Sequence, residues 1–257
     1  KDHTGDGING DDDMTLTNCT FEGNNINGIQ ASGSDLTIDH ILIGHSTNNG
    51  IHTTNGCSLI LKNSIVRYSG GHGINLTDNT ETTILNSWIH NNDASGFYSS
   101  NHTVETLHLR NNTIYDNDSY GIECSEYGAD PNISNCIISG NDSNDLYRVN
   151  GSFNKVNYCL LQNTHSGIGN LTGDPCFMNI DIDSDDLHLD ETSQCKDSGD
   201  PNGDYDETDI DGENRIYYGR VDIGADEYYW SPADFNEDGF VNLIDCAIFV
   251  AAWQSEP

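Results

Sequence analysis

The chain has 257 residues, enough for one large domain or for a domain with a small appendage, and only 34% of them are hydrophobic. It carries 42 acidic and 9 basic residues, which give a formal net charge of -33 at pH 7. A field of this sign repels phosphate backbones and anionic membrane surfaces, so we expect no nucleic-acid partner, and no apolar run is long enough for a membrane span.

Two short motifs repeat in step through the first part of the chain. In the first, a glycine is followed by an aliphatic or aromatic residue at intervals of 21 to 25 residues. Its copies are Gly7-Ile8, Gly28-Ile29, Gly50-Ile51, Gly73-Ile74, Gly96-Phe97 and Gly121-Ile122. The second is a six-residue segment that starts at Leu16, Ile38, Leu61, Ile84, Leu109, Ile133 and Val156. Such a period predicts a solenoid in which each repeat is one coil.

Each coil is expected to contain two or three short strands that cannot bury an apolar face alone. Stacking the coils about 4.8 Å apart buries one continuous column of Ile, Leu, Val and Phe. The third position of the second motif predicts an inward ladder of amides, each hydrogen-bonded to its copy one coil away. Its members are Asn18, His40, Asn63, Asn86, Asn111 and Asn135. A leucine-rich repeat has a similar period, but it requires a helical return where this chain has turn residues.

These motifs resemble the pectate-lyase-like superfamily of right-handed parallel β-helices, and the resemblance covers roughly residues 5 to 170. It implies an all-β, right-handed parallel β-helix solenoid of about seven to eight coils across residues 1–172. The superfamily includes polysaccharide lyases, glycoside hydrolases, epimerases, adhesins and non-catalytic surface proteins. The fold by itself therefore does not select an activity.

Enzymes of the fold that this chain resembles place their chemistry on the solvent face of one stacked sheet, in a groove for an extended polysaccharide. Aligning the coils on the first motif gives an outward row of Asn9, Gln30, His52, Asn75, Tyr98, Glu123 and Tyr147. The row two residues earlier contains Asn27, Asn49, His72, Ser95, Tyr120 and Asn144. We therefore expect a cluster of His52, His72, Tyr98, Tyr120 and Glu123.

Two interpretations of this cluster are open. A Tyr and His pair can abstract the proton next to a uronate carboxylate and protonate the leaving oxygen, which is general acid and base catalysis of β-elimination. Stacked aromatic and amide side chains also stabilise neighbouring strands in inert sheets. Because Arg67, Arg110 and Arg148 do not align as a pair that would neutralise a uronate, we expect a non-catalytic surface. A polysaccharide lyase or glycoside hydrolase is the alternative.

Residues 173–230 break the repeat and resemble the closing segment that many secreted bacterial β-helix proteins carry after their last coil. Such a segment covers the last strand edge, whose unpaired backbone groups otherwise invite aggregation. Cys176 and Cys195 both lie in it and are the disulfide that we expect. Two acidic runs offer candidate calcium ligands, namely Asp181-x-Asp183-x-Asp185-Asp186 and Asp200, Asn202, Asp204 and Asp206.

Residues 231–257 contain the pattern of a calcium loop followed by a helix. Oxygen donors stand at loop positions 1, 3, 5, 9 and 12, Gly239 at position 6 permits the sharp turn, and a backbone carbonyl supplies position 7. The predicted ligands are Asp234, Asn236, Asp238, Phe240, Asn242 and Asp245. Asp at position 12 resembles the type I dockerin repeat, and that resemblance implies that Leu243 and Ile244 contact a cohesin-bearing partner. Dockerins normally have two such loops, whereas this segment has one.

Together these features predict a secreted protein, extracellular or at a cell surface, with calcium as its cofactor. The expected role is structural, adhesive or scaffold-attached. The expected partners are a cohesin-type scaffold, an extracellular polysaccharide, or further copies of the chain, since head-to-tail contacts that do not close propagate into a filament.

Overall fold

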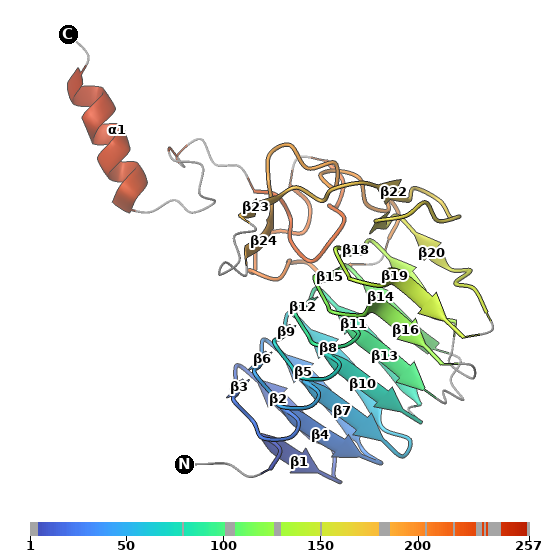
Figure 1. The fold of residues 1–257 in the computed structure, drawn as a ribbon. Coiled ribbons are helices and arrows are strands. Elements are labelled where there is room, and N and C mark those ends of the chain that lie inside the picture. Colours follow the sequence, from blue (N-terminus) through green and yellow to red (C-terminus); the bar gives the residue numbers. More distant parts are fainter. Residues whose placement is uncertain are drawn as a thin grey trace.

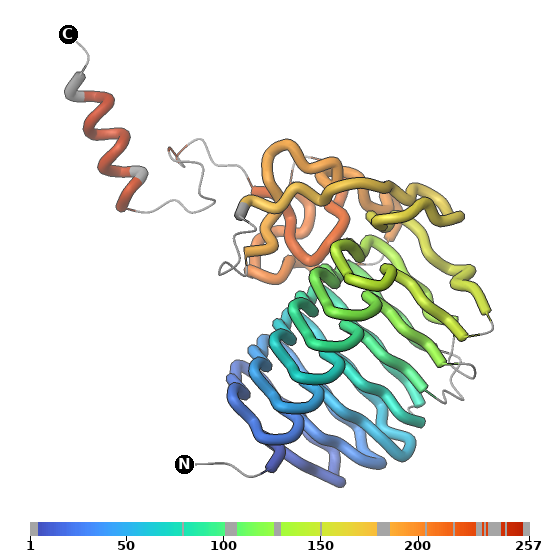
Figure 2. Tube along the Cα trace, in the orientation of Figure 1, coloured from blue at the N-terminus to red at the C-terminus, as the bar shows by residue number. Residues whose placement is uncertain are grey.

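The structure is a computed structural model that describes residues 5–78, 80–100, 106–125, 130–149, 151–179, 186–203, 205–217, 219–229, 233, 235 and 243–255. Over most of this range the chain winds as a parallel β-solenoid, in which successive turns add strands to three sheets (Figure 1). The trace in Figure 2 shows the turns stacked in chain order from the N-terminal end.

The three sheets run along the length of the solenoid. Sheet A consists of β1 (Ile8–Gly10), β4 (Ile29–Ser32), β7 (Ile51–Thr54), β10 (Ile74–Thr77), β13 (Phe97–Ser100), β16 (Tyr120–Cys124) and β19 (Asn144–Arg148). Sheet B consists of β2 (Met14–Thr17), β5 (Asp35–Asp39), β8 (Ser58–Lys62), β11 (Glu81–Leu85), β14 (Thr106–Arg110), β17 (Asn132–Ser134) and β20 (Val156–Asn157). Sheet C consists of β3 (Thr20–Glu22), β6 (Leu42–Gly44), β9 (Ile65–Arg67), β12 (Trp88–His90), β15 (Thr113–Tyr115), β18 (Ile137–Ser139), β21 (Leu160–Leu161) and β22 (Leu171–Thr172).

The solenoid has about six turns, slightly fewer than the seven to eight coils expected. Six steps lead from β1 to β19 along sheet A. The difference arises at the C-terminal end, where β20, β21 and β22 have two residues each and do not complete a further coil of full-length strands.

The interior is one column of apolar side chains. In sheet A, Ile29, Ile51, Ile74, Phe97 and Ile122 are partners from coil to coil and are fully buried. Because parallel strands place the same coil position about 4.8 Å from its copy, a large apolar residue at one position builds a continuous stack. The predicted apolar column is confirmed.

The glycine of the first motif is required because the next coil passes close to its Cα atom. A Cβ atom on Gly50 would lie 2.5 Å from Val66 Cγ1 and 2.6 Å from the carbonyl oxygen of Gly73. The carbonyl belongs to the backbone and cannot rotate away. A side chain at this position therefore forces the coils apart.

The asparagine ladder lies on the outside of the coils, so the expected inward direction was wrong. All six of its residues have φ between 46° and 53°, the left-handed region in which Asn and His are enriched. Asn86 Nδ2 donates to Asn63 Oδ1 at 3.3 Å, as the ladder predicts, whereas Asn63 Nδ2 donates at 2.8 Å to Oδ1 of Asp39, the residue before His40. The left-handed bend turns these side chains outward and leaves the following residue of each coil facing the interior.

Two inward polar ladders satisfy the backbone at the bends. In one, the backbone N–H of Ser87 donates to Asn112 Oδ1 at 3.0 Å. In the other, Asn92 Nδ2 donates to Asn117 Oδ1 and Asn117 Nδ2 donates to Asn141 Oδ1, both at 2.9 Å. These side chains are buried, and they supply hydrogen bonds where the strands are interrupted.

The segment after the coils folds as a cap along the outside of sheet C. It contains the antiparallel pair β23 (Phe177–Asn179) and β24 (Asp186–Leu189) and is otherwise built from turns. Ile210, Ile223 and Ala225 of the cap bury the outward side chains of Trp88 and Ile137. The cap thus covers an apolar stripe on the side of the solenoid.

The expected disulfide between Cys176 and Cys195 is not formed. All eight cysteines lie in the described part of the chain and are free thiols. Cys176 has a φ of 53° and its Sγ lies 3.7 Å from the carbonyl oxygen of Asp174, whereas Cys195 is fully buried in the apolar cluster of the cap. Each thiol is therefore held by its own surroundings.

The helix α1 (Leu243–Ser255) is the one helix among the described residues. It presents large apolar side chains to solvent, with Leu243 86% and Trp253 73% exposed. No helix in the part of the chain that the structure describes is long and apolar enough to cross a membrane.

We predict that Gly50→Ala lowers the free energy of unfolding by about 1–3 kcal/mol, because the added methyl group overlaps the next coil. Gly44→Ala is the matched control, since its Cβ atom would find no atom closer than 3.5 Å. Urea unfolding followed by circular dichroism measures both variants. Equal midpoints for the two variants would contradict the close approach of the coils.

Candidate functional site

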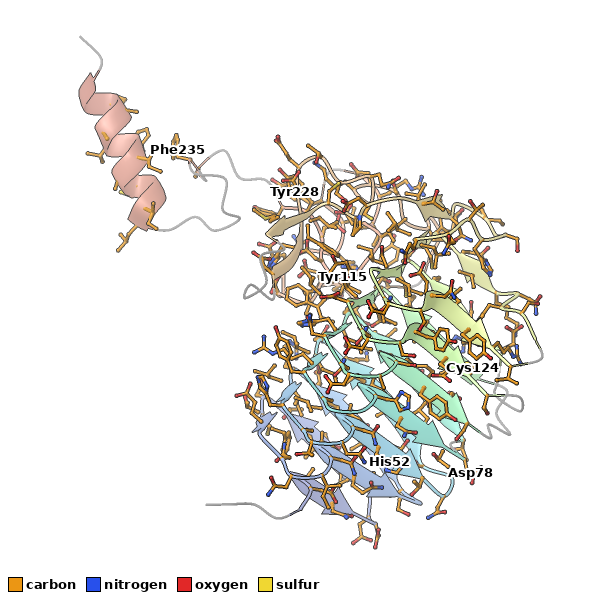
Figure 3. All side chains as sticks on the ribbon, viewed as in Figure 1. His52, Asp78, Tyr115, Cys124, Tyr228 and Phe235 are labelled. Atoms are coloured by element: carbon orange, nitrogen blue, oxygen red, sulfur yellow. The ribbon has the colours of Figure 1, made fainter. Side chains whose placement is uncertain are left out.

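The solvent face of sheet A brings the expected groove residues together. The strand register places His52 between Gln30 and Asn75, and Tyr98 between Asn75 and Glu123. Figure 3 labels His52 on this face of the coils. The complete row of strand partners is Asn9, Gln30, His52, Asn75, Tyr98, Glu123 and Tyr147. The side chains therefore lie in the row that the alignment of the coils predicted.

A chain of hydrogen bonds runs along the neighbouring row. Asp6 Oδ1 accepts the backbone N–H of Asn27 at 2.9 Å, and Asn27 Oδ1 accepts that of Asn49 at 3.1 Å. Asn49 Oδ1 accepts the backbone N–H of His72 at 3.1 Å, and His72 Nδ1 accepts that of Ser95 at 3.2 Å. Because Nδ1 of His72 is an acceptor, a neutral His72 carries its proton on Nε2.

Aromatic rings form two stacked pairs on this face. The rings of His72 and Tyr98 lie 4.6 Å apart at an interplanar angle of 15°, and those of Tyr120 and Tyr147 lie 4.4 Å apart at 11°. Each pair joins side chains of successive coils. Flat aromatic surfaces combined with amide side chains suit the apolar faces and hydroxyl groups of a sugar chain.

His52 and His72 on this face are partly buried, and the carboxylate of Glu123 is hydrogen-bonded. Burial lowers the pKa of both His52 and His72 below the ordinary value. Glu123 Oε2 accepts a hydrogen bond from the hydroxyl of Ser95 at 2.6 Å. The Ser95–Glu123 hydrogen bond links two coils of this face, and it uses one oxygen of the Glu123 carboxylate.

Acidic residues line the turns that lead into the groove. Asp93, Asp118 and Asp142 occupy equivalent places in successive coils, since the backbone N–H groups of Asp118 and Asp142 donate to the preceding coil. Partial burial and the neighbouring Asp93 and Asp142 carboxylates raise the pKa of Asp118. Arg67, Arg110 and Arg148, by contrast, lie on strands of three different sheets, β9, β14 and β19. This edge repels a polyuronate.

The two outward rows do not hold a pair of carboxylates at the distance that glycoside hydrolysis requires. Asp6 and Glu123 are separated by five coils, about 24 Å at a strand spacing of about 4.8 Å. Hydrolysis of a glycosidic bond uses two carboxyl groups about 5–9.5 Å apart. Asp6 and Glu123 are therefore not placed as the carboxyl pair of such a reaction.

Comparison with protein families agrees with the solenoid. A family model described as "Right handed beta helix region" matches residues 2–132, just over half of the chain. The chain belongs to the right-handed β-helix family. This family includes polysaccharide-active enzymes and structural proteins. No curated protein matches the chain.

Carboxylates organise the cap of this β-helix protein. Asp209 Oδ1 accepts the backbone N–H of Glu213 at 2.9 Å, and its Oδ2 accepts that of Glu227 at 3.1 Å. Glu227 Oε2 in turn accepts the backbone N–H of Asp222 at 2.9 Å. Asp209, Asp222 and Glu227 are all buried. In a cap with few strands, these side chains take the place of sheet hydrogen bonds.

Arg215 is the buried cation at the centre of this network. Its side chain is 1% exposed and donates to the backbone carbonyls of Gly224 and Ala225, at 2.9 Å for Ala225. The amide of Asn111, turned so that its oxygen accepts, receives Nε of Arg215 at 3.0 Å. Burial lowers the pKa of Arg215, and the surrounding carboxylates, with Glu227 first, oppose that shift. Arg215 thus joins the cap to the outer ladder of the β-helix.

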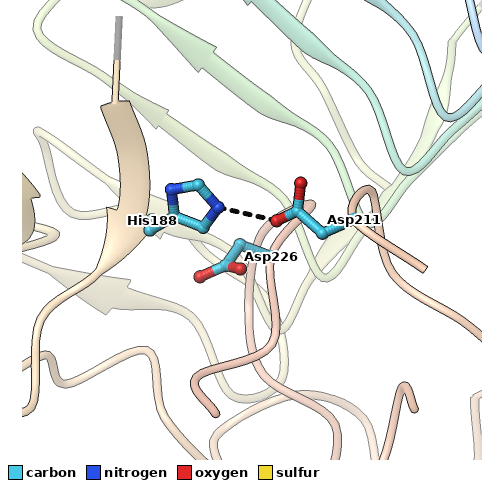
Figure 4. A group of neighbouring side chains, drawn as sticks. All are labelled: His188, Asp211 and Asp226. Atoms are coloured by element: carbon cyan, nitrogen blue, oxygen red, sulfur yellow. Dashed lines mark hydrogen bonds and ion pairs between the residues drawn. The ribbon is translucent and has the colours of Figure 1, made fainter. Parts of the chain in front are cut away.

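A second cluster of ionisable groups lies at the surface of the cap, where β24 meets two loops (Figure 4). His188 Nε2 lies 2.6 Å from Asp211 Oδ2, and Nδ1 forms a short hydrogen bond with Asp186. Asp226 lies beside the ring, is 4% exposed, and accepts the backbone N–H of Leu189 at 2.8 Å. Burial lowers the pKa of His188, but hydrogen bonds to Asp186 and Asp211 prevail and raise it to about 11.

Neither feature of the cap was predicted from the sequence. Asp186 was expected in a calcium run, and no role was predicted for His188, Arg215 or Asp226. The alternation in Asp186-Leu187-His188-Leu189 was a usable signal, because it places Asp186 and His188 on the same face of a strand. Asp211 and Asp226, which lie beside His188, come from loops further along the chain, where no alternating pattern marks them.

The predicted calcium ligands mostly lie outside the described residues. These are, in the C-terminal loop, Asp234, Asn236, Asp238, Phe240, Asn242 and the side chain of Asp245, and, in the two acidic runs, Asp181, Asp183, Asp185 and Asp204. Of the remaining run, Asp200 Oδ1 accepts the backbone N–H of Asn202 at 2.9 Å, and Asp206 forms an ion pair with Lys62 at 3.4 Å. The expected partner-binding residues Leu243 and Ile244 are exposed in the first turn of α1.

We predict that Arg215→Met lowers the free energy of unfolding by about 3–5 kcal/mol, because it leaves buried carboxylates without their cation. Arg220→Met is the matched control: Arg220 is exposed and hydrogen-bonds to the Ser198 carbonyl, so we expect a loss of at most about 1 kcal/mol. Thermal and urea unfolding provide the comparison. If Arg215→Met unfolded like the control, the central role of the buried cation would be refuted.

Proposed function

We propose that this protein is an extracellular, adhesive or scaffold-attached β-helix that holds an extended, uncharged polysaccharide along sheet A without cleaving it. The main support for this proposal is the presence of two aromatic stacks on one outward face, His72 with Tyr98 and Tyr120 with Tyr147. Rings repeated from coil to coil present a linear surface, which suits a ligand that is itself a linear repeat.

The charge of the face supports an uncharged ligand. Glu123 and the acidic turns with Asp93, Asp118 and Asp142 give the groove a negative edge, in a chain whose formal net charge is -33. A polyuronate would meet like charges, and binding it would cost free energy. Sugar hydroxyl groups, in contrast, can donate to carboxylates and amides, and the apolar faces of sugar rings can stack on tyrosine.

The C-terminal segment is proposed to bind calcium and to attach the protein to a scaffold. The support is the ligand spacing from Asp234 to Asp245 and its likeness to a type I dockerin repeat. The exposed apolar side chains at the start of α1, Leu243 and Ile244, suit contact with a cohesin-type partner. Self-association into filaments is a further outcome that the same segment permits.

A polysaccharide-active enzyme is the second candidate, favoured by the stack of His72 on Tyr98 and by the partial burial of both His72 and His52. A general base must be unprotonated before it accepts a proton, and burial, which lowers the pKa of both imidazoles, favours that form. This candidate requires turnover. Reducing ends or unsaturated products would appear when the protein is incubated with a panel of polysaccharides.

We predict that Tyr98→Ala and Tyr120→Ala each weaken binding of an uncharged polysaccharide at least tenfold, because each removes one ring from a stacked pair. Affinity electrophoresis in gels that contain neutral or uronate polysaccharides measures the retardation. Tyr229→Ala is the matched control, since Tyr229 is an exposed tyrosine of the cap. Equal retardation of all three variants would contradict polysaccharide binding on this face of sheet A.

We predict that calcium controls the size of the assembled protein through the C-terminal loop. Light scattering and electron microscopy, first with calcium and then with chelator, should show ordered polymers or complexes with a cohesin-type partner only in calcium. Asp234→Ala should abolish the response, whereas Glu191→Ala, which removes an exposed carboxylate of the cap outside both acidic runs, should keep it. A monomer that neither assembles nor binds such a partner in calcium would contradict this part of the proposal.

A further inference from the structure

The surface cluster of the cap has the arrangement of a metal site built around a histidine. One oxygen each of Asp211 and Asp226 and one ring nitrogen of His188 lie within 4.8 Å of one another. The three side chains come from β24, from the loop after it and from the last segment of the cap (Figure 4). A ligand held by all three would join segments that share few backbone hydrogen bonds.

The orientation of the His188 ring is fixed from its other side. Nδ1 bonds to Asp186, which leaves Nε2 directed at Asp211. Histidines that bind metals almost always donate their second ring N–H to a carboxylate or carbonyl, which sets the tautomer and strengthens the ligand. Asp186 is placed to serve in this way, outside the three ligands.

The surroundings of Asp226 favour a cation. This carboxylate is 4% exposed and accepts the backbone N–H of Leu189 at 2.8 Å. The buried cation Arg215 donates hydrogen bonds to the carbonyl oxygens of Gly224 and Ala225 and to the amide of Asn111. Carboxylates withdrawn from water are stabilised by a cation in contact with them.

We propose that His188, Asp211 and Asp226 bind a divalent transition-metal ion of the zinc class. An imidazole nitrogen with two carboxylates suits zinc, whereas calcium takes six to eight oxygen ligands. Tetrahedral bonds of about 2.0–2.1 Å place ligand atoms about 3.3 Å apart, so Nε2 and the Asp211 oxygen need to separate by less than 1 Å from their present 2.6 Å. The ion replaces the proton between these two atoms and leaves a fourth position for water.

The test is a zinc titration of the full chain after removal of metals with chelator. Isothermal titration calorimetry with zinc chloride should show one site that excess calcium does not block. His188→Asn should weaken this site at least a hundredfold, and Asp186→Asn should weaken it about 10–100-fold through the orientation of the ring. His40→Asn is the matched control, because His40 is an exposed histidine beside the single carboxylate of Asp39. It should bind zinc as the parent chain does.

X-ray absorption at the zinc edge keeps the proposal falsifiable if a cap variant fails to fold. The parent chain should show one imidazole nitrogen and carboxylate oxygens at about 2.0–2.2 Å. Asp234→Ala should leave zinc binding unchanged, which separates the site from the calcium loop. Absence of a zinc site, coordination without imidazole, or a folded His188→Asn variant that binds zinc normally would each overturn the proposal and leave a protonated His188 bridging Asp186 and Asp211.

Discussion

The structure depends on the pairing of each strand with its copy one coil away. This pairing repeats every choice of residue along the solenoid, so an apolar residue at one position becomes a column, an amide becomes a ladder and a tyrosine becomes a stacked surface. It also explains the glycines: Gly50 and its equivalents stand where the next backbone passes too closely for a side chain. The aromatic face of sheet A is a consequence of the same pairing, since His72 meets Tyr98 and Tyr120 meets Tyr147 only because the coils are in register.

The cap follows a different physical rule. Its residues have little regular structure, and buried carboxylates such as Asp209 and Glu227 hold the backbone by accepting N–H groups. This concentrates negative charge away from water, which requires a compensating cation. Arg215 supplies one inside the cap, and the His188 cluster offers a place for another at its surface. Stability of the cap and attraction for cations therefore have the same origin.

The repeat carried enough information to predict the solenoid, the apolar column and the outward row through His52, Tyr98 and Glu123, because these depend on a fixed period. It did not reveal that Asn111 and Asn135 face outward, since that direction follows from a positive φ at the bend. The position of the cap was also missed, although the outward apolar residues Trp88 and Ile137 on sheet C were a signal that this face needs cover. Contacts such as that of Asn111 with Arg215 join segments far apart in the chain, and no periodic pattern in a single sequence predicts them.

The central functional claim is that sheet A binds a sugar chain and leaves it intact. Nuclear magnetic resonance of the protein with labelled tyrosine rings, during titration with an uncharged oligosaccharide, tests both the binding and the absence of cleavage in one sample. We expect shifts for the rings of Tyr98, Tyr120 and Tyr147, no shift for Tyr229, and an oligosaccharide of unchanged length at the end. A shortened oligosaccharide, or shifts confined to tyrosines outside sheet A, would contradict it.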